Sequence, residues 1–245
     1  MLLTNDKTKP AKIDRFTLLA LIVALIVYPL LYSTDFFFSL LLPLLSEESL
    51  RSLLDENTRV EWWYLHISNF FFHWIAFVFV WLALVKNNQS WSSIGVNWRW
   101  FDTYRPWFLV LLVFLIASAL VMPGIHYGEQ IPTKSQTHFI GPVSTLERLF
   151  MIITALTAAV TEEVLFRGFA FTRLKRWIAN PWLILPITLV SFVLIHGEPR
   201  SLEQVLPLIL GGLAFAIPFI LMGLKRLELI ILIHFFIDAG LVLAP

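Results

Sequence analysis

The sequence predicts an all-α fold, a polytopic membrane bundle of about seven transmembrane helices with the N-terminus in the cytoplasm. The first observation is composition: of 245 residues, 58% are hydrophobic and 14% charged, and the mean hydropathy is +0.77. A soluble domain carries about 25% charged residues, so this chain has too much apolar surface for one soluble core. The net charge of +1 excludes nucleic-acid binding through a basic face. The absence of cysteine excludes a disulfide scaffold.

The second observation is a series of apolar stretches separated by charged or Pro/Gly-containing segments. A membrane-spanning helix needs roughly 20 apolar residues, and most of these stretches approach that length. The predicted spans are Phe16–Tyr32, Trp62–Val85, Pro106–Met122, Leu146–Leu174, Pro181–His196, Leu202–Leu224 and Leu229–Leu243.

The third observation is the alternation of charge between the loops. Cytoplasmic loops of membrane proteins are enriched in Lys and Arg. With the N-terminus inside, the inner loops contain 13 of the 18 basic residues: Lys7, Lys9, Lys12, Arg15, Lys86, Arg99, Arg105, Arg167, Arg173, Lys175, Arg176, Lys225 and Arg226. Acidic residues crowd the first outer loop instead: Glu47, Glu48, Asp55, Glu56 and Glu61. The chain is therefore predicted to be a multi-pass integral membrane protein in contact with the lipid bilayer.

A few ionisable residues fall inside the predicted spans. They are Glu162, Glu163, His196, His234 and Asp238, with Arg167 nearby. Such groups cost several kcal/mol in hydrocarbon and usually face a cavity or one another, so they are candidates for function. Two further histidines of the second span, His66 and His73, are interpreted as interhelical or interfacial hydrogen-bond formers.

The segment from Glu162 to Arg167 carries the strongest pattern. Glu163 and Arg167 are four residues apart, so on a helix they share a face and can pair. Glu162 points about 100° away from that pair, which leaves one carboxylate free to serve as a general base or acid. The structural alternative is a pair of acids that hydrogen-bond to Arg167 and to loop donors at a helix end.

Two more pairs have the same spacing. Phe192 and His196 lie four residues apart, as do His234 and Asp238, so each pair lies on one helix face. With a rise of about 1.5 Å per residue, the polar members of three helices are expected to converge midway through the bilayer.

In this order on successive spans, the motifs Glu-Glu-x-x-x-Arg, Phe-x-x-x-His and His-x-x-x-Asn or Asp resemble the CPBP family of intramembrane proteases. That family includes the CAAX prenyl endopeptidases and bacteriocin-processing or self-immunity proteins. The matching positions are Glu162, Glu163 and Arg167, then Phe192 and His196, then His234 and Asp238. Ile94-Gly95-Val96 extends the resemblance to a CPBP-like protease core over residues 91–245, whereas residues 1–90 form a membrane segment with two spans and no motif.

The resemblance implies a glutamic-type endopeptidase in which Glu162, assisted by His196, activates water against a peptide carbonyl. His234 and residue 238 would stabilise the oxyanion, and Glu163, Arg167 and Phe192 would orient the site. The family commonly has Asn where this chain has Asp238, and an ionised Asp cannot donate a hydrogen bond to an oxyanion. The implied substrate is a membrane-embedded or lipid-anchored peptide or protein, and the expected location is a bacterial inner membrane.

The sequence leaves three alternatives to a metal-free protease open. Zinc could bind Glu162, His196 and His234, since the family was once described as metal-dependent; the sequence lacks the His-Glu-x-x-His helix of zinc proteases, and a mechanism without a cofactor is favoured. A proton-coupled transporter or channel also uses Glu/His/Asp chains, but the inverted repeats or broken helices expected of one are not found. A non-proteolytic immunity or scaffold role on the same fold is the third.

Overall fold

The structure is a computed structural model that describes residues 13–33, 60–97, 142, 144–196 and 201–243. Within these ranges every regular element is helical and none is a strand, which confirms the predicted all-α class. The elements are α1 (Arg15–Ile22), η1 (Val23–Val27), α2 (Tyr28–Ser33), α5 (Val60–Lys86), η3 (Trp91–Ile94), α7 (Thr145–Glu162), η5 (Glu163–Phe171), α8 (Thr172–Leu174), α9 (Pro181–Leu194), α10 (Leu202–Leu221) and α11 (Leu227–Leu243).

Four of the described helices are long and apolar enough to cross a membrane. They are Arg15–Ser33, His66–Lys86, Thr145–Leu174 and Gln204–Leu221, and Pro181–Leu194 is a shorter apolar helix. Together with α11, these helices match six of the predicted spans, while the predicted span over 106–122 lies outside the described residues. The total of seven spans and the cytoplasmic N-terminus therefore stay predictions.

Helix ends follow from local side chains. Asp14 accepts hydrogen bonds from the backbone N–H groups of Phe16 and Thr17, and so caps α1. Ser144 and Glu147 form a reciprocal capping box at the start of α7. Asn180 caps α9, whose first residue, Pro181, has no N–H to leave unsatisfied.

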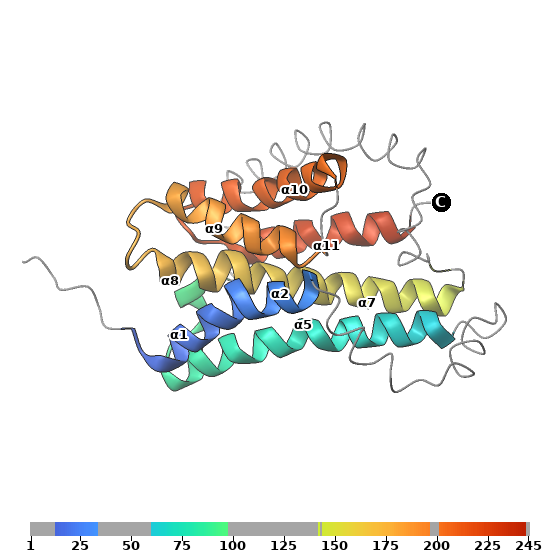
Figure 1. Cartoon of the computed structure of the whole chain (residues 1–245), viewed down its shortest axis with the longest axis horizontal. Coiled ribbons are helices and arrows are strands. Elements are labelled where there is room, and N and C mark those ends of the chain that lie inside the picture. The colour runs from blue at the N-terminus through green and yellow to red at the C-terminus, as the bar shows by residue number, and fades with distance from the viewer. Residues whose placement is uncertain (1–12, 34–59, 98–141, 143, 197–200, 244–245) are drawn as a thin grey trace, which may run out of the picture.

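The helix ends that the sequence places on the inner side lie together at one end of the bundle, at the left of Figure 1. Asn87, after α5, donates to the Thr17 hydroxyl at 3.3 Å. Arg173, in α8, donates to Gln89 at 2.6 Å and to the Ser93 hydroxyl at 2.9 Å. α1 and α5 therefore run in opposite directions, whereas α5 and α7 run in the same direction, with Trp62 beside Phe150 at their starts and Gln89 beside Arg173 after their ends.

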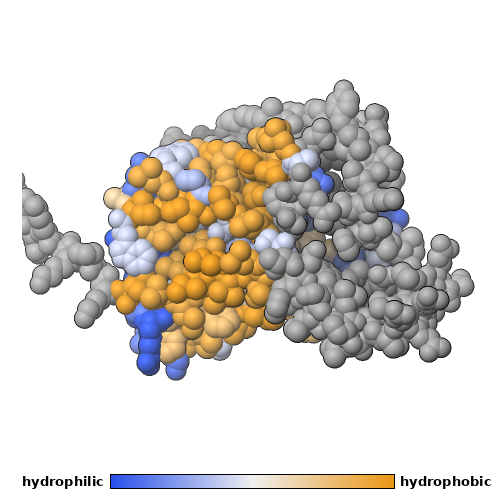
Figure 2. Space-filling model, in the orientation of Figure 1, coloured by the Kyte–Doolittle hydropathy of each residue, from blue (hydrophilic) through white to orange (hydrophobic). Residues whose placement is uncertain are grey.

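The outer surface is apolar around this bundle. Figure 2 shows hydrophobic residues over the middle of the described surface, with hydrophilic residues at its left edge. Exposed side chains include Phe71, Trp81, Leu183, Val190 and Phe236, each at least 46% exposed. A soluble protein rarely exposes so wide an apolar surface, whereas lipid tails would cover it without cost.

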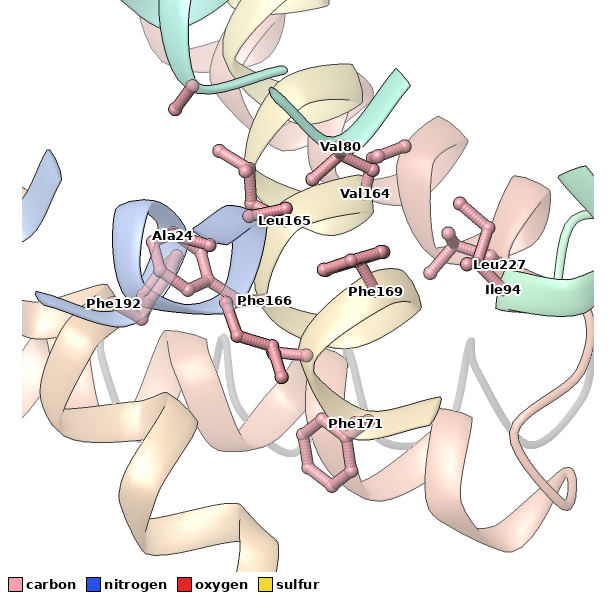
Figure 3. Packing of buried hydrophobic residues seen from close by; sticks show 14 of the residues in the cluster. Ala24, Val80, Ile94, Val164, Leu165, Phe166, Phe169, Phe171, Phe192 and Leu227 are labelled. Atoms are coloured by element: carbon pink, nitrogen blue, oxygen red, sulfur yellow. The ribbon is translucent and has the colours of Figure 1, made fainter. Parts of the chain in front are cut away.

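A π-helix, η5, lies at the centre of the fold. All nine of its residues, Glu163–Phe171, are buried. Figure 3 shows Val164, Leu165, Phe166 and Phe169 of this segment packed among side chains of other helices. A second π-helix, η1, interrupts the first helix, and there Ser191 of α9 donates to the Leu25 carbonyl at 2.9 Å. Such π segments are rare and frequently lie at functional sites.

Gly95→Ala is expected to destabilise the fold by about 1–3 kcal/mol. Gly95 has a φ of +94°, and a Cβ there would lie 2.8 Å from the Leu224 carbonyl oxygen and 2.8 Å from the Phe219 ring. The matched control is Gly211→Ala inside α10, where no described atom lies within 4 Å of the added Cβ. Thermal melting in detergent checks the prediction, and equal melting temperatures for the two variants would contradict it.

Candidate functional site

The site is built around the buried carboxylate of Glu163, the first residue of η5. Its Oε1 accepts from Nη1 of Arg167 at 3.1 Å and lies 2.9 Å from Nδ1 of His234 on α11. All three side chains are buried. The ion pair between Glu163 and Arg167 has the four-residue spacing predicted from the sequence. The contact with His234 joins two helices and was not predicted.

Aromatic rings enclose the guanidinium of Arg167. Its Cζ lies 4.1 Å from the Phe192 ring centroid and 5.7 Å from that of Phe215. The Phe215 ring also stacks on the His234 ring, with centroids 4.4 Å apart and an interplanar angle of 18°. Arg167 further donates to the Gly212 carbonyl at 3.2 Å. Phe192 and Phe215 thus pack against the cation, while the orienting role of Phe192 stays a prediction.

Both ring nitrogens of His234 face carboxylates. Nδ1 faces Glu163, and Nε2 lies 3.3 Å from Oδ2 of Asp238 one turn along α11. Glu163 is fully buried, whereas the Asp238 side chain is 31% exposed. The contact of Nε2 with Asp238 is therefore easier to replace by another hydrogen bond than the contact of Nδ1 with Glu163.

Glu162 differs sharply from its neighbour Glu163. It is the last residue of α7 and is 4% exposed, yet its Oε2 is buried and has no hydrogen-bond partner among the residues that the structure describes. Oε2 of Glu163 also lacks one, but the other oxygen of that residue binds both Arg167 and His234. Glu162 lies within electrostatic range of His234 and Asp238. A buried carboxylate oxygen without a partner is costly and calls for an explanation such as a catalytic role.

His196 lies just beyond the helix to which the sequence assigned it. The predicted span ran to His196, but α9 ends at Leu194, so His196 lies in the turn that follows. Its ring packs on Phe192, with centroids 4.7 Å apart, and Nδ1 lies 2.8 Å from the Phe192 carbonyl oxygen. Because a carbonyl can only accept, Nδ1 carries the proton, and in the neutral ring Nε2 has the lone pair. As a whole residue His196 is exposed, in contrast to His234.

The polar groups lie at similar depths in the bundle. Counted from the inner end of each helix at about 1.5 Å per residue, Glu162 lies about 18 Å deep, Asp238 about 16 Å and His196 about 22 Å. His234 lies nearer that end, at about 10 Å, but its ring reaches Glu163. α7, η5, α11 and the turn after α9 thus bring the ionisable residues of the predicted spans into one region.

A comparison with known protein families finds a match to this region of the chain. Residues 144–240 match the family model Rce1-like, described as type II CAAX prenyl endopeptidase Rce1-like. This part of the chain is similar to that family, and residues 144–240 are called the Rce1-like domain below. The match confirms the resemblance drawn from the three motifs, and with the apolar helices it identifies a membrane protein of protease type. Neither the curated proteins nor the solved structures give a significant match to the chain.

All the candidate site residues, from Glu162 to Asp238, lie within the Rce1-like domain. The segment before it, Ile94-Gly95-Val96, is largely buried, and the Gly95 carbonyl accepts from the Leu227 N–H at 2.9 Å. This contact joins the segment to the start of α11. A protease core that begins at residue 91, and the catalytic roles assigned to individual residues, stay predictions.

The sequence analysis missed the contribution of residues 1–90 to this region. His73 of α5 is buried, and its Nδ1 lies 3.1 Å from the Tyr28 hydroxyl and 3.3 Å from Oγ1 of Thr161. Thr161 directly precedes Glu162. The predicted hydrogen-bonding role of His73 is confirmed, whereas its partners could not be predicted, because they lie on two other helices. Asn69, one turn away, accepts from the Tyr32 hydroxyl.

The residues suggested for zinc do not form a ligand set in the Rce1-like domain as described. No three His, Cys, Asp or Glu side chains within the described ranges gather closely enough to hold a metal ion. His234 directs both ring nitrogens at carboxylates, and Nδ1 of His196 is bound to a backbone carbonyl.

Proposed function

We propose that this chain is an intramembrane endopeptidase in which Glu162 activates water to hydrolyse a peptide bond. The observation that carries the proposal is the contrast between two adjacent buried carboxylates. Glu163 is fixed by Arg167 and His234, whereas Oε2 of Glu162 is buried without a partner among the described residues. A carboxylate that is held close to charged groups but lacks its own partner suits a general base.

His196 and Glu162 would act together on the water molecule. Nδ1 of His196 donates to the Phe192 carbonyl, so Nε2 can accept a hydrogen bond from water and orient it. Glu162 takes the proton as the water oxygen bonds to the carbonyl carbon. In the second step the carbon–nitrogen bond breaks, and Glu162 returns the proton to the leaving amine. Atoms and charge balance without a cofactor.

His234 would supply the hydrogen bond to the oxyanion. Its Nε2 faces Asp238 at 3.3 Å in the structure, and this carboxylate is the more exposed of its two partners. Developing charge on the substrate oxygen would compete with Asp238 for that N–H, while the Glu163 contact keeps the ring in place. Asp238 would thus orient His234 in the resting site rather than donate to the oxyanion itself.

The substrate class that we propose is a membrane-embedded or lipid-anchored peptide. The match to a type II CAAX prenyl endopeptidase family supports a peptide with a prenylated cysteine three residues before its C-terminus. A site about 18 Å from one end of its helix requires a substrate that enters the bilayer, as a lipid anchor would ensure. The bacterial inner membrane stays the proposed location.

The proposal is tested with the full-length protein in liposomes and a fluorogenic peptide that ends in farnesylated cysteine and three further residues. Release of the C-terminal tripeptide, identified by mass spectrometry, is the expected result. In water enriched in oxygen-18, one heavy oxygen should enter the new carboxylate of the farnesylated product. Absence of any new cleavage product, both for this peptide and in membrane proteomes compared with and without the protein, would reject the proposed activity.

We further propose that hydrolysis needs no bound metal. Incubation of the purified protein with EDTA or 1,10-phenanthroline, followed by removal of the chelator, is expected to leave the cleavage rate unchanged. The reason is that Glu162 and the two histidines provide a base and hydrogen-bond groups of their own. Loss of cleavage after chelation, with recovery on addition of zinc and not of magnesium, would show that the metal-free mechanism is wrong.

A further inference from the structure

The hydroxyl of Thr161 shows how the first two helices act on the site. This hydroxyl has a single proton, and its nearest acceptor is the Thr157 carbonyl oxygen at 2.8 Å. The lone pairs of Oγ1 are then left to face His73, whose Nδ1 lies 3.3 Å away. In its Nδ1–H tautomer, His73 can donate to this oxygen and to the Tyr28 hydroxyl, which lies 3.1 Å from the same nitrogen. His73 thus holds the last turn of α7 from the side of α5.

Tyr28 contacts the same ring nitrogen of His73 from a third helix. Its hydroxyl lies 3.1 Å from Nδ1, and the two rings meet edge to face with centroids 6.5 Å apart. Tyr28 is 3% exposed and is the first residue of α2. α2 and α7 therefore both contact the ring of His73, which α5 carries.

This cluster lies at the level of the catalytic carboxylate. Counted at about 1.5 Å per residue, Tyr28 and His73 both lie about 20 Å from the inner ends of their helices, close to the depth of Glu162. Glu162 lies within electrostatic range of Tyr28, and His73 lies within range of His196, His234 and Asp238. The helix also changes from α to π at this point, since α7 ends at Glu162 and η5 follows.

We propose that Tyr28, His73 and Thr161 are positioning residues for the hydrolysis carried out by the Rce1-like domain. They fix the rotation of the last turn of α7 and thereby the direction of the Glu162 carboxylate toward the water that it activates. The inference rests on the proposed function. It also makes the two N-terminal spans, which lie outside the domain match, part of the working enzyme.

The test compares variants of the full-length protein in liposomes with the farnesylated peptide. His73→Phe removes the hydrogen bonds, His73→Asn keeps a donor or acceptor near the position of Nδ1, and Thr161→Val keeps the shape of the side chain. Ser191→Ala is the matched control, because it deletes another buried interhelical hydrogen bond, to Leu25, without touching the cluster. For each variant, kcat, KM and the melting temperature are measured. Carbodiimide labelling of Glu162, followed by mass spectrometry, adds a measure that needs no substrate.

Misplacement of a catalytic group by about 1 Å can cost 10²-fold in rate, so His73→Phe and Thr161→Val are expected to lower kcat about 10- to 100-fold with little change in KM. His73→Asn should recover most of the loss, and the labelling rate of Glu162 should shift in His73→Phe but not in Ser191→Ala. Unchanged kcat and labelling in folded His73→Phe or Thr161→Val would overturn the proposal, as would an equal loss in Ser191→Ala. If the wild type fails to cleave the peptide, the proposed function fails, and the labelling result alone decides on the positioning role.

Discussion

Glu162→Gln is expected to abolish peptide cleavage while leaving the protein folded in the membrane. A positioned general base contributes about 10²- to 10⁴-fold to the rate, and the amide of glutamine cannot take a proton from water. Stability should change little, because Oε2 of Glu162 has no hydrogen-bond partner to lose among the described residues. The measurements are the initial cleavage rate in liposomes and the melting temperature in detergent.

The matched control for this variant is Glu147→Gln, the same substitution on the same helix. Glu147 closes the capping box of α7 with Ser144, and glutamine can replace glutamate in that motif. Glu147→Gln should therefore keep both its cleavage rate and its fold. Wild-type cleavage by Glu162→Gln would show that another group activates the water, and the glutamate mechanism would have to be abandoned.

The sequence alone was sufficient to predict the helices and the contacts made within one helix. Apolar length placed the described helices within a few residues of their observed bounds, because the bilayer sets the length of a span. The four-residue spacing likewise predicted the contacts of Glu163 with Arg167 and of His234 with Asp238. Both pairs depend on helical geometry only and need no information on how the helices pack.

Contacts between helices could not be predicted in the same way. The contact of His234 with Glu163 depends on how α11 is rotated against η5, and that rotation follows from the packing of many apolar side chains. The contacts of His73 with Tyr28 and Thr161 join residues 45 and 88 positions apart. The π-helical form of η5 was also missed, since its sequence has the apolar pattern of an ordinary helix. A single sequence contains no signal for these features, so a contact of residues 1–90 with the site could not be predicted.

The second large effect is expected for Glu163→Gln, and it concerns stability. Removing one partner of a buried ion pair costs about 3–5 kcal/mol, because the remaining charge stays buried without compensation. Glutamine can still accept from Arg167 and His234 through its carbonyl oxygen, but it brings no negative charge. Both groups reach the same atom, Glu163 Oε1, so one substitution weakens two contacts. The melting temperature should therefore fall far more than in Glu162→Gln, while cleavage measured below the melting temperature should fall less.

A double-mutant cycle separates the ion pair from other causes of instability. Arg167→Met alone leaves Glu163 buried with His234 as its partner, whereas Glu163→Gln with Arg167→Met removes both charges and keeps the side-chain volumes similar. If the pair acts as a unit, the double variant should lose clearly less stability than the sum of the two single losses. Additive losses would contradict this account, because they would mean that Glu163 and Arg167 stabilise the bundle independently, for example through the stacking of Arg167 on Phe192.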